Sequence, residues 1–126
     1  MASILVIEDD EQIRALLKQI LERAGHEVLE APDGNKGLRI YRKNLPDLII
    51  TDIIMPEKDG LETIRELRKM NPDVKIIAVS GGGFIHSDYY LDMAKRFGAF
   101  SILAKPFTPA EVLNAVNQLL QKGEIR

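Results

Sequence analysis

Five short apolar runs alternate along the chain with stretches of helical periodicity, and this alternation restricts the fold more than any other feature. The runs that we predict to be strands are residues 4–7, 27–30, 48–51, 76–79 and 100–104. Four of them are largely apolar, which is typical of strands buried on both faces of a parallel sheet. The run at 27–30 is more polar and therefore favours an edge of that sheet.

Helical patterns fill the intervals between these runs. The apolar positions that mark four helices are Ile13, Leu17, Ile20, Leu21 and Ala24; Ile64 and Leu67; Tyr90, Met93, Ala94 and Phe97; and Val112, Ala115, Val116 and Leu119. Asp59 and Thr108 are predicted N-caps, because each precedes a glutamate at the third following position. Residues 33–43 form the weakest predicted helix, since two glycines lower its helix propensity.

Strands that alternate with helices predict an α/β fold, a doubly wound five-stranded parallel sheet flanked by five helices. Right-handed crossovers leave few topologies, and we predict the strand order 2-1-3-4-5. The chain of 126 residues is predicted to be one domain, residues 1–126 with a core at 4–121. In this order the first and third strands are neighbours, and ligands of such sheets bind beyond the carboxyl ends of those strands.

Composition restricts the function further. The net charge is −2, from 17 basic and 19 acidic side chains, so we expect no nucleic-acid or membrane partner for this domain. The absence of cysteine excludes zinc–thiolate sites and thiol catalysis, and it fits a cytoplasmic location. No apolar run approaches the ~20 residues that cross a bilayer, and the first residues do not have the pattern of a signal peptide.

Carboxylates follow two of the predicted strands. Glu8 and Asp9 come directly after the first strand, and Asp52 follows the third. Like charges at one sheet edge raise one another's pKa unless a cation compensates for them. A ligand set made only of oxygen atoms suits a hard ion, most simply Mg²⁺, with Mn²⁺ as the substitute. Asp10 could join this site or cap the next helix, and the sequence leaves both readings open.

The remaining strand ends supply complementary groups. Ser80 ends the fourth strand and is followed by Gly81, where backbone can approach a ligand closely. The fifth strand leads to Lys105, a cation beside the acidic residues. A metal ion, a carboxylate nucleophile, a hydroxyl and a cation are the parts that phosphoryl transfer to a carboxylate needs.

Five motifs carry a resemblance to a known family. They are residues 4–9 (ILVIED), residues 52–56 (DIIMP), Asp59-Gly60, Ser80-Gly81 and Lys105-Pro106-Phe107. In this order and spacing they resemble the receiver domain of two-component response regulators, the CheY-like superfamily with a flavodoxin-like fold. The resemblance covers almost the whole chain.

The resemblance implies that Asp52 accepts a phosphoryl group from a histidine kinase or a histidine phosphotransfer protein. It also implies that Asp9 binds Mg²⁺ directly, that Glu8 binds it through water, and that the backbone carbonyl of Ile54 completes the site. The residues that it assigns to the phosphoryl group and the switch are Ser80, Gly81 and Lys105, the last with a cis peptide bond to Pro106.

Two features depart from the family. Many receivers have Tyr or Phe three residues before the lysine, where this chain has Ile102, so a rotating aromatic ring cannot be the readout. Residues 81–83 are three glycines followed by a partly apolar segment. We hypothesise that this loop becomes ordered when Asp52 is phosphorylated, which hydrogen exchange across residues 80–88 would test.

Other protein classes fit the residues less well. An electron carrier of the flavodoxin type would cradle a phosphate in its first loop, which the acidic residues 8–10 would repel. A dinucleotide-binding dehydrogenase needs a glycine fingerprint after the first strand, and none is present. A haloacid-dehalogenase-type phosphatase needs a second acid at the position of Ile54. A receiver-fold binding module that signals without phosphorylation stays open as an alternative.

The sequence therefore predicts a phosphorylation-controlled switch and not a metabolic enzyme. We expect it to promote its own phosphorylation from a donor and its own slow dephosphorylation. Phosphorylation is expected to change partner binding or dimerisation through the fourth helix, the fifth strand and the fifth helix. The chain is either a single-domain regulator or a receiver whose output domain is missing, and its kinase and downstream target stay unknown.

Overall fold

The structure, a computed structural model, describes residues 2–53, 60–80, 96 and 101–124. Its elements are β1 (Ser3–Ile7), α1 (Glu11–Arg23), β2 (Glu27–Ala31), α2 (Gly34–Asn44), β3 (Leu48–Asp52), α3 (Gly60–Met70), β4 (Ile76–Ser80), β5 (Ser101–Ala104) and α5 (Pro109–Glu124). The predicted fourth helix and the predicted cap at Asp59 lie outside the described residues. None of the described helices is both long and apolar enough to cross a membrane.

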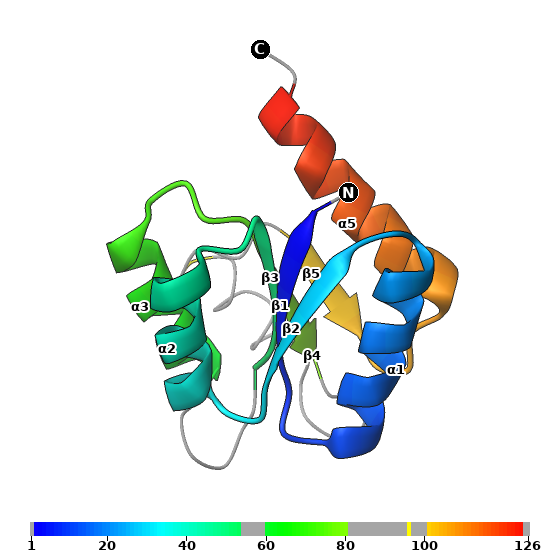
Figure 1. The fold of residues 1–126 in the computed structure, drawn as a ribbon, viewed down its shortest axis with the longest axis horizontal. Coiled ribbons are helices and arrows are strands. Elements are labelled where there is room, and N and C mark those ends of the chain that lie inside the picture. The colour runs from blue at the N-terminus through cyan, green and yellow to red at the C-terminus, as the bar shows by residue number, and fades with distance from the viewer. Residues whose placement is uncertain (1, 54–59, 81–95, 97–100, 125–126) are drawn as a thin grey trace.

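The five strands form one parallel sheet in the order β2-β1-β3-β4-β5, as predicted. Figure 1 shows α2 and α3 on one face of this sheet and α1 and α5 on the other. The polar strand β2 stands at an edge, which confirms the prediction for residues 27–30. Strand β1 pairs with the central strand β3, with Ile7 opposite Thr51, so the residues that follow both strands emerge side by side.

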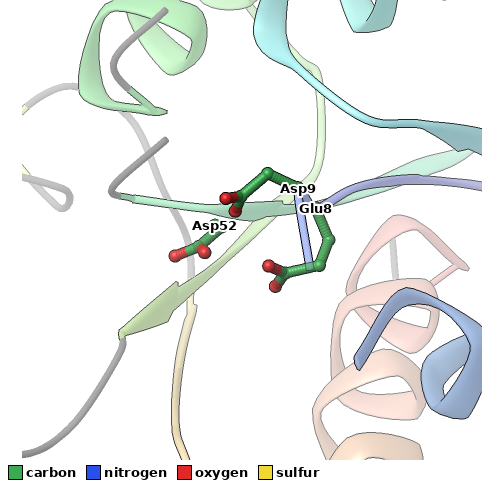
Figure 2. Close-up of side chains that lie close together, drawn as sticks. All are labelled: Glu8, Asp9 and Asp52. Carbon is green, nitrogen blue, oxygen red and sulfur yellow. The ribbon is translucent and has the colours of Figure 1, made fainter. Parts of the chain in front are cut away.

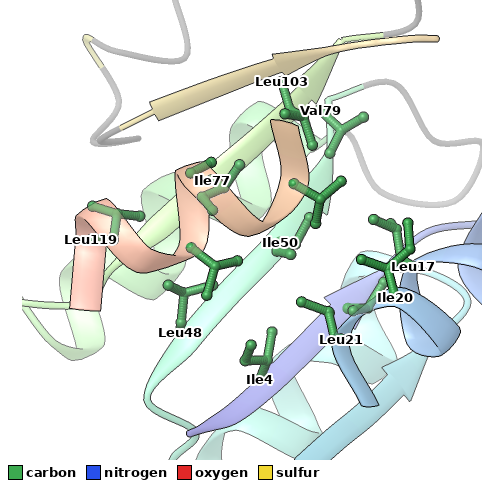
Figure 3. Packing of buried hydrophobic residues seen from close by; sticks show 14 of the residues in the cluster. Ile4, Leu17, Ile20, Leu21, Leu48, Ile50, Ile77, Val79, Leu103 and Leu119 are labelled. Atoms are coloured by element: carbon green, nitrogen blue, oxygen red, sulfur yellow. The ribbon is translucent and has the colours of Figure 1, made fainter. Parts of the chain in front are cut away.

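Alternate residues of each central strand enter two separate apolar cores. Leu5 and Ile7 of β1 join the cluster beneath α2 and α3, whereas Ile4 and Val6 join the cluster beneath α1 and α5. Figure 3 shows the second cluster, where side chains from the strands meet others from α1 and α5. Because the sheet is covered on both faces, the carboxyl ends of its strands are held in fixed relative positions.

The helix predicted to be weakest, α2, does form, and one of its glycines has a packing role. Asp33 caps it by accepting a hydrogen bond from the Lys36 amide at 2.9 Å. A Cβ added at Gly37 would stand 2.8 Å from Cγ1 of Ile7. The glycine that lowers helix propensity is therefore the residue that lets α2 approach β1 closely.

The last helix begins with the capping box that the sequence predicts. The Thr108 amide donates to Oε1 of Glu111 at 2.8 Å, and the Glu111 amide donates to Oγ1 of Thr108 at 3.1 Å. These two bonds satisfy two donors at the start of α5, the helix that supplies Val112 and Val116 to the core.

We expect Thr108→Ala to lower the free energy of unfolding by about 1 kcal/mol, because the Glu111 amide loses its acceptor. Thr108→Ser keeps the hydroxyl and should stay within about 0.5 kcal/mol of the wild type. Urea denaturation followed by circular dichroism measures both variants. Equal midpoints for the alanine and serine variants would contradict a capping role.

Candidate functional site

Three carboxylates gather at the carboxyl edge of the sheet. Glu8, Asp9 and Asp52 each offer an oxygen atom that lies within 4.8 Å of those of the other two. Figure 2 shows that Glu8 and Asp9 approach from the end of β1 and Asp52 from the end of β3. Glu8 and Asp52 are only 1% and 4% exposed, whereas Asp9 is exposed. The structure thus brings the predicted acidic residues together, two of them buried and one accessible.

Glu8 is a buried carboxyl that lacks part of its hydrogen bonding. Its Oε2 accepts the amide of Asp10 at 3.1 Å. Its Oε1 lies 3.3 Å from Nζ of Lys105 but has no aligned hydrogen bond among the described residues. Burial, and then the charge of Asp52, raise the pKa of Glu8 to about 7. At neutral pH, and without a bound metal ion, the Glu8 carboxyl is therefore about half ionised.

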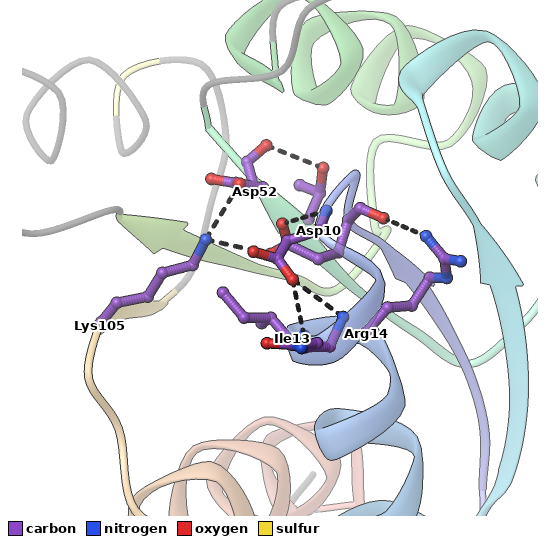
Figure 4. A network of polar contacts seen from close by, with 8 residues as sticks. Asp10, Ile13, Arg14, Asp52 and Lys105 are labelled. Carbon is purple, nitrogen blue, oxygen red and sulfur yellow. Dashed lines mark hydrogen bonds and ion pairs between the residues drawn. The ribbon is translucent and has the colours of Figure 1, made fainter.

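Lys105 supplies the positive charge of the site. Its Nζ lies 3.2 Å from Oδ2 of Asp52, as Figure 4 shows. The same Nζ lies 3.3 Å from Oε1 of Glu8. Burial alone would lower the pKa of Lys105, but Asp52 and Glu8 outweigh burial and raise it. The lysine therefore stays protonated. Its peptide bond to Pro106 is cis, as the resemblance implies.

The donor set fits a divalent cation. Among the described residues, Lys105 is the cation recorded beside the three carboxylates, and Oε1 of Glu8 is a buried acceptor without a hydrogen-bond donor. Oxygen ligands suit a hard ion such as Mg²⁺. The acidic pocket is therefore compatible with a divalent metal ion.

Asp10 belongs to the helix and not to this pocket. Its Oδ1 accepts the amides of Gln12 at 2.9 Å and Ile13 at 3.1 Å, so it is the N-cap of α1. Of the two readings that the sequence leaves open, helix capping is the one that the structure supports.

The other predicted site residues are only partly described. Ser80 ends β4 opposite Ala104 of β5, at the same edge of the sheet as the carboxylates. Ile102 lies on β5 opposite Ala78, partly buried against the core beneath α2 and α3. Ile54 and Gly81 lie outside the described residues, and so does most of the glycine loop proposed to become ordered.

Gly60 has a role beside the site that the sequence did not reveal. Its amide donates to the carbonyl of Ile53 at 2.7 Å, and this contact holds the start of α3 against the end of β3. A Cβ at this position would lie 2.6 Å from Cα of Ile53 and would overlap the carbonyl oxygen of Asp52. In the sequence, the Asp59-Gly60 pair was interpreted as a helix cap and as one of the five family motifs, and neither interpretation indicated this contact.

We expect Gly60→Ala to lower the free energy of unfolding by about 2 kcal/mol. The added methyl group would overlap backbone atoms, which cannot move aside as the end of a flexible side chain can. The gain in helix propensity, at most about 1 kcal/mol, does not offset this overlap. Thermal denaturation measures the effect, with Arg65→Ala on the exposed face of the same helix as the control. A Gly60→Ala variant as stable as the wild type would show that the Asp52–Ile53 backbone does not constrain this position.

Comparison with known proteins places this geometry in a family. The model of the response regulator receiver domain matches residues 4–117. The chemotaxis protein CheY of Thermotoga maritima is 35% identical over 117 residues, which cover 92% of this chain and 95% of that protein. Among solved structures, a response regulator receiver domain protein from Clostridium thermocellum superposes with a TM-score of 0.87. It is 36% identical, with 98% of both chains covered.

Relatives differ in how much of their length this chain spans. It covers 50% of the alkaline phosphatase synthesis transcriptional regulatory protein PhoP of Bacillus subtilis, at 34% identity. It covers 25% of the DNA-binding transcriptional regulator NtrC of Azospirillum brasilense, at 39% identity. In each case the matched segment has the length of one receiver domain. The fold, the acidic pocket and these matches agree, and the chain belongs to the response regulator receiver domain family of two-component signalling.

Proposed function

We propose that this chain accepts a phosphoryl group on Asp52 from a histidine kinase or a histidine phosphotransfer protein, and that the modified chain changes its partner binding or its dimerisation. The observation that carries this proposal is the position of the Asp52 carboxylate, which is buried between two further carboxylates and the ammonium group of Lys105. A buried carboxylate beside a cation and a candidate metal pocket is suited to attack on phosphorus.

The transfer is a displacement at phosphorus. An oxygen atom of Asp52 forms the new O–P bond while the P–N bond of the donor phosphohistidine breaks. The electron pair of that bond goes to the imidazole nitrogen, and the imidazole leaves neutral because its other nitrogen carries a proton. Lys105, 3.2 Å from Oδ2 of Asp52, exchanges its carboxylate contact for the transferred phosphoryl oxygens.

A divalent cation, Mg²⁺ or Mn²⁺, would be held by Glu8, Asp9 and Asp52, and when bound it offsets the negative charge of the phosphoryl oxygens. The carbonyl of Ile54 and the hydroxyl of Ser80 stay predicted partners of the metal and of the phosphoryl group, respectively. Without the cation, the carboxylates and the phosphoryl group repel one another, so uptake should depend on metal.

The output of the switch follows from the elements beside Lys105. The modified site would bias two conformations of β5, α5 and the predicted fourth helix, and so change which protein or second copy binds there. Ile102, partly buried on β5, would move with the strand and not as a rotating ring. The chain would act as a phosphoacceptor with slow autodephosphorylation and not as a metabolic enzyme.

The test is incubation with a small phosphodonor such as acetyl phosphate, with and without Mg²⁺, followed by intact mass spectrometry. We expect one added phosphoryl group per chain with Mg²⁺ and none when the metal is chelated. Light scattering on the modified chain then detects dimerisation. No uptake from acetyl phosphate or from a phosphorylated histidine donor would overturn the proposal in favour of a binding module that signals without phosphorylation.

A further inference from the structure

Arg14 connects the acidic pocket to the edge strand of the sheet. Its Nη1 donates to the main-chain carbonyl of Glu8 at 2.8 Å, and its Nε donates to Oε1 of Glu30 on β2 at 3.3 Å. The arginine side chain is 16% exposed, so most of it is packed between α1 and the sheet. Figure 4 shows Arg14 reaching from the first turns of α1 toward the segment that carries the acidic residues.

This contact completes a clamp on both backbone groups of Glu8. The Glu8 amide donates to the carbonyl of Ala31 at the end of β2, at 3.0 Å. Its carbonyl is held through Arg14 by Glu30, one residue earlier on the same strand. The clamped carbonyl belongs to the peptide that joins Glu8 to Asp9, so its direction determines how both of these side chains leave the backbone.

Glu30 is itself held from a second side. Nζ of Lys18 lies 3.2 Å from Oε2 of Glu30, on the oxygen that Arg14 does not use. The Lys18 side chain is 41% exposed. Among the described residues, Arg14 is the side chain that donates a hydrogen bond to the Glu8 carbonyl. The two cations thus share one carboxylate, but Arg14 is the more buried of the two and also contacts the acidic segment.

We propose that Arg14, anchored by Glu30, is a positioning residue that holds Glu8 and Asp9 in the orientation that binds a divalent cation. Glu8, Asp9 and Asp52 repel one another before a cation arrives, and the segment after β1 would relax outward without a tether. Partners that orient metal ligands change affinity about 10- to 100-fold when they are removed. The inference rests on the metal pocket of the proposed function but not on phosphoryl transfer.

The sign of the effect separates positioning from simple electrostatics. Removal of a positive charge near the carboxylates should by itself tighten cation binding. Removal of a tether should weaken it. Loss of an exposed ion pair that only stabilises the fold should leave the cation affinity unchanged.

The experiment measures Mn²⁺ binding from the electron paramagnetic resonance signal of the free ion, with Mg²⁺ as competitor. Arg14→Met keeps much of the side-chain volume without its donors, and Lys18→Met is the matched control that removes one charge from the same Glu30. We expect the dissociation constant to rise about tenfold in Arg14→Met and to stay within about twofold of the wild type in Lys18→Met. Arg14→Lys, which retains one charged donor, should bind with intermediate affinity.

Equal or tighter binding by Arg14→Met than by Lys18→Met would overturn the inference, as would a wild-type chain that binds no Mn²⁺. If Arg14→Met fails to fold in circular dichroism, Arg14→Gln replaces it, because it removes the same positive charge with a polar side chain; weakened binding is again expected, and unchanged or tighter binding is again decisive against the clamp. Because no phosphodonor is present, a chain that binds metal normally but takes up no phosphoryl group contradicts only the proposed function.

Discussion

Asp52→Asn is expected to take up no phosphoryl group from acetyl phosphate, a loss of at least about 10³-fold in rate, because an amide lacks the nucleophilic oxygen of a carboxylate. The fold should survive, since asparagine has nearly the same shape and removes one of three mutually repelling charges. Intact mass after incubation with Mg²⁺ measures uptake, and circular dichroism checks the fold.

The matched control is Asp10→Asn. Asp10 lies two residues after Glu8, yet its side chain caps α1, a role that asparagine fills equally well. This variant should be phosphorylated at the wild-type rate. Full uptake by Asp52→Asn would assign the acceptor to another residue, which peptide mapping of the modified chain would identify.

The second large effect is on stability, through Glu8. In metal-free buffer the free energy of unfolding should fall by about 3 kcal/mol between pH 4.5 and pH 7 because of this one group. The folded chain keeps a proton on Glu8 up to about pH 7, whereas the unfolded chain releases it near its ordinary pKa of 4.5. The stability that this proton contributes is fully present below pH 4.5 and is lost as the pH rises through 7.

Comparison with Glu8→Gln isolates this effect from all other titrations. Urea denaturation in EDTA at several pH values should give a wild-type curve that falls relative to the glutamine curve across this interval. Millimolar Mg²⁺ should stabilise the wild type more at pH 8 than at pH 5, because protons compete with the metal for the carboxylates. Parallel curves for the two proteins in EDTA would mean that Glu8 titrates at its ordinary pKa in the folded chain.

Local patterns were sufficient to predict much of the fold. The edge position of β2 followed from the polarity of residues 27–30. The strand order followed from the alternation of apolar runs together with the few topologies that right-handed crossovers allow. The cap at Thr108 followed from the glutamate three residues later. Such features depend on neighbours in the sequence or on short periods, and for this reason they can be recognised without coordinates.

The sequence by itself determined which chemical groups stand at the carboxyl ends of the strands: Glu8 and Asp9 after β1, and Asp52 at the end of β3. Only the tertiary structure decided how those groups are held. It brought Gly60 against the backbone of Asp52, and it linked the Glu8 carbonyl to Glu30 through Arg14. These contacts join residues that are far apart in the chain or on different elements, and the raised pKa of Glu8 depends on the same burial. No spacing rule encodes them, because they arise from packing distances that exist only after the sheet and its helices have assembled.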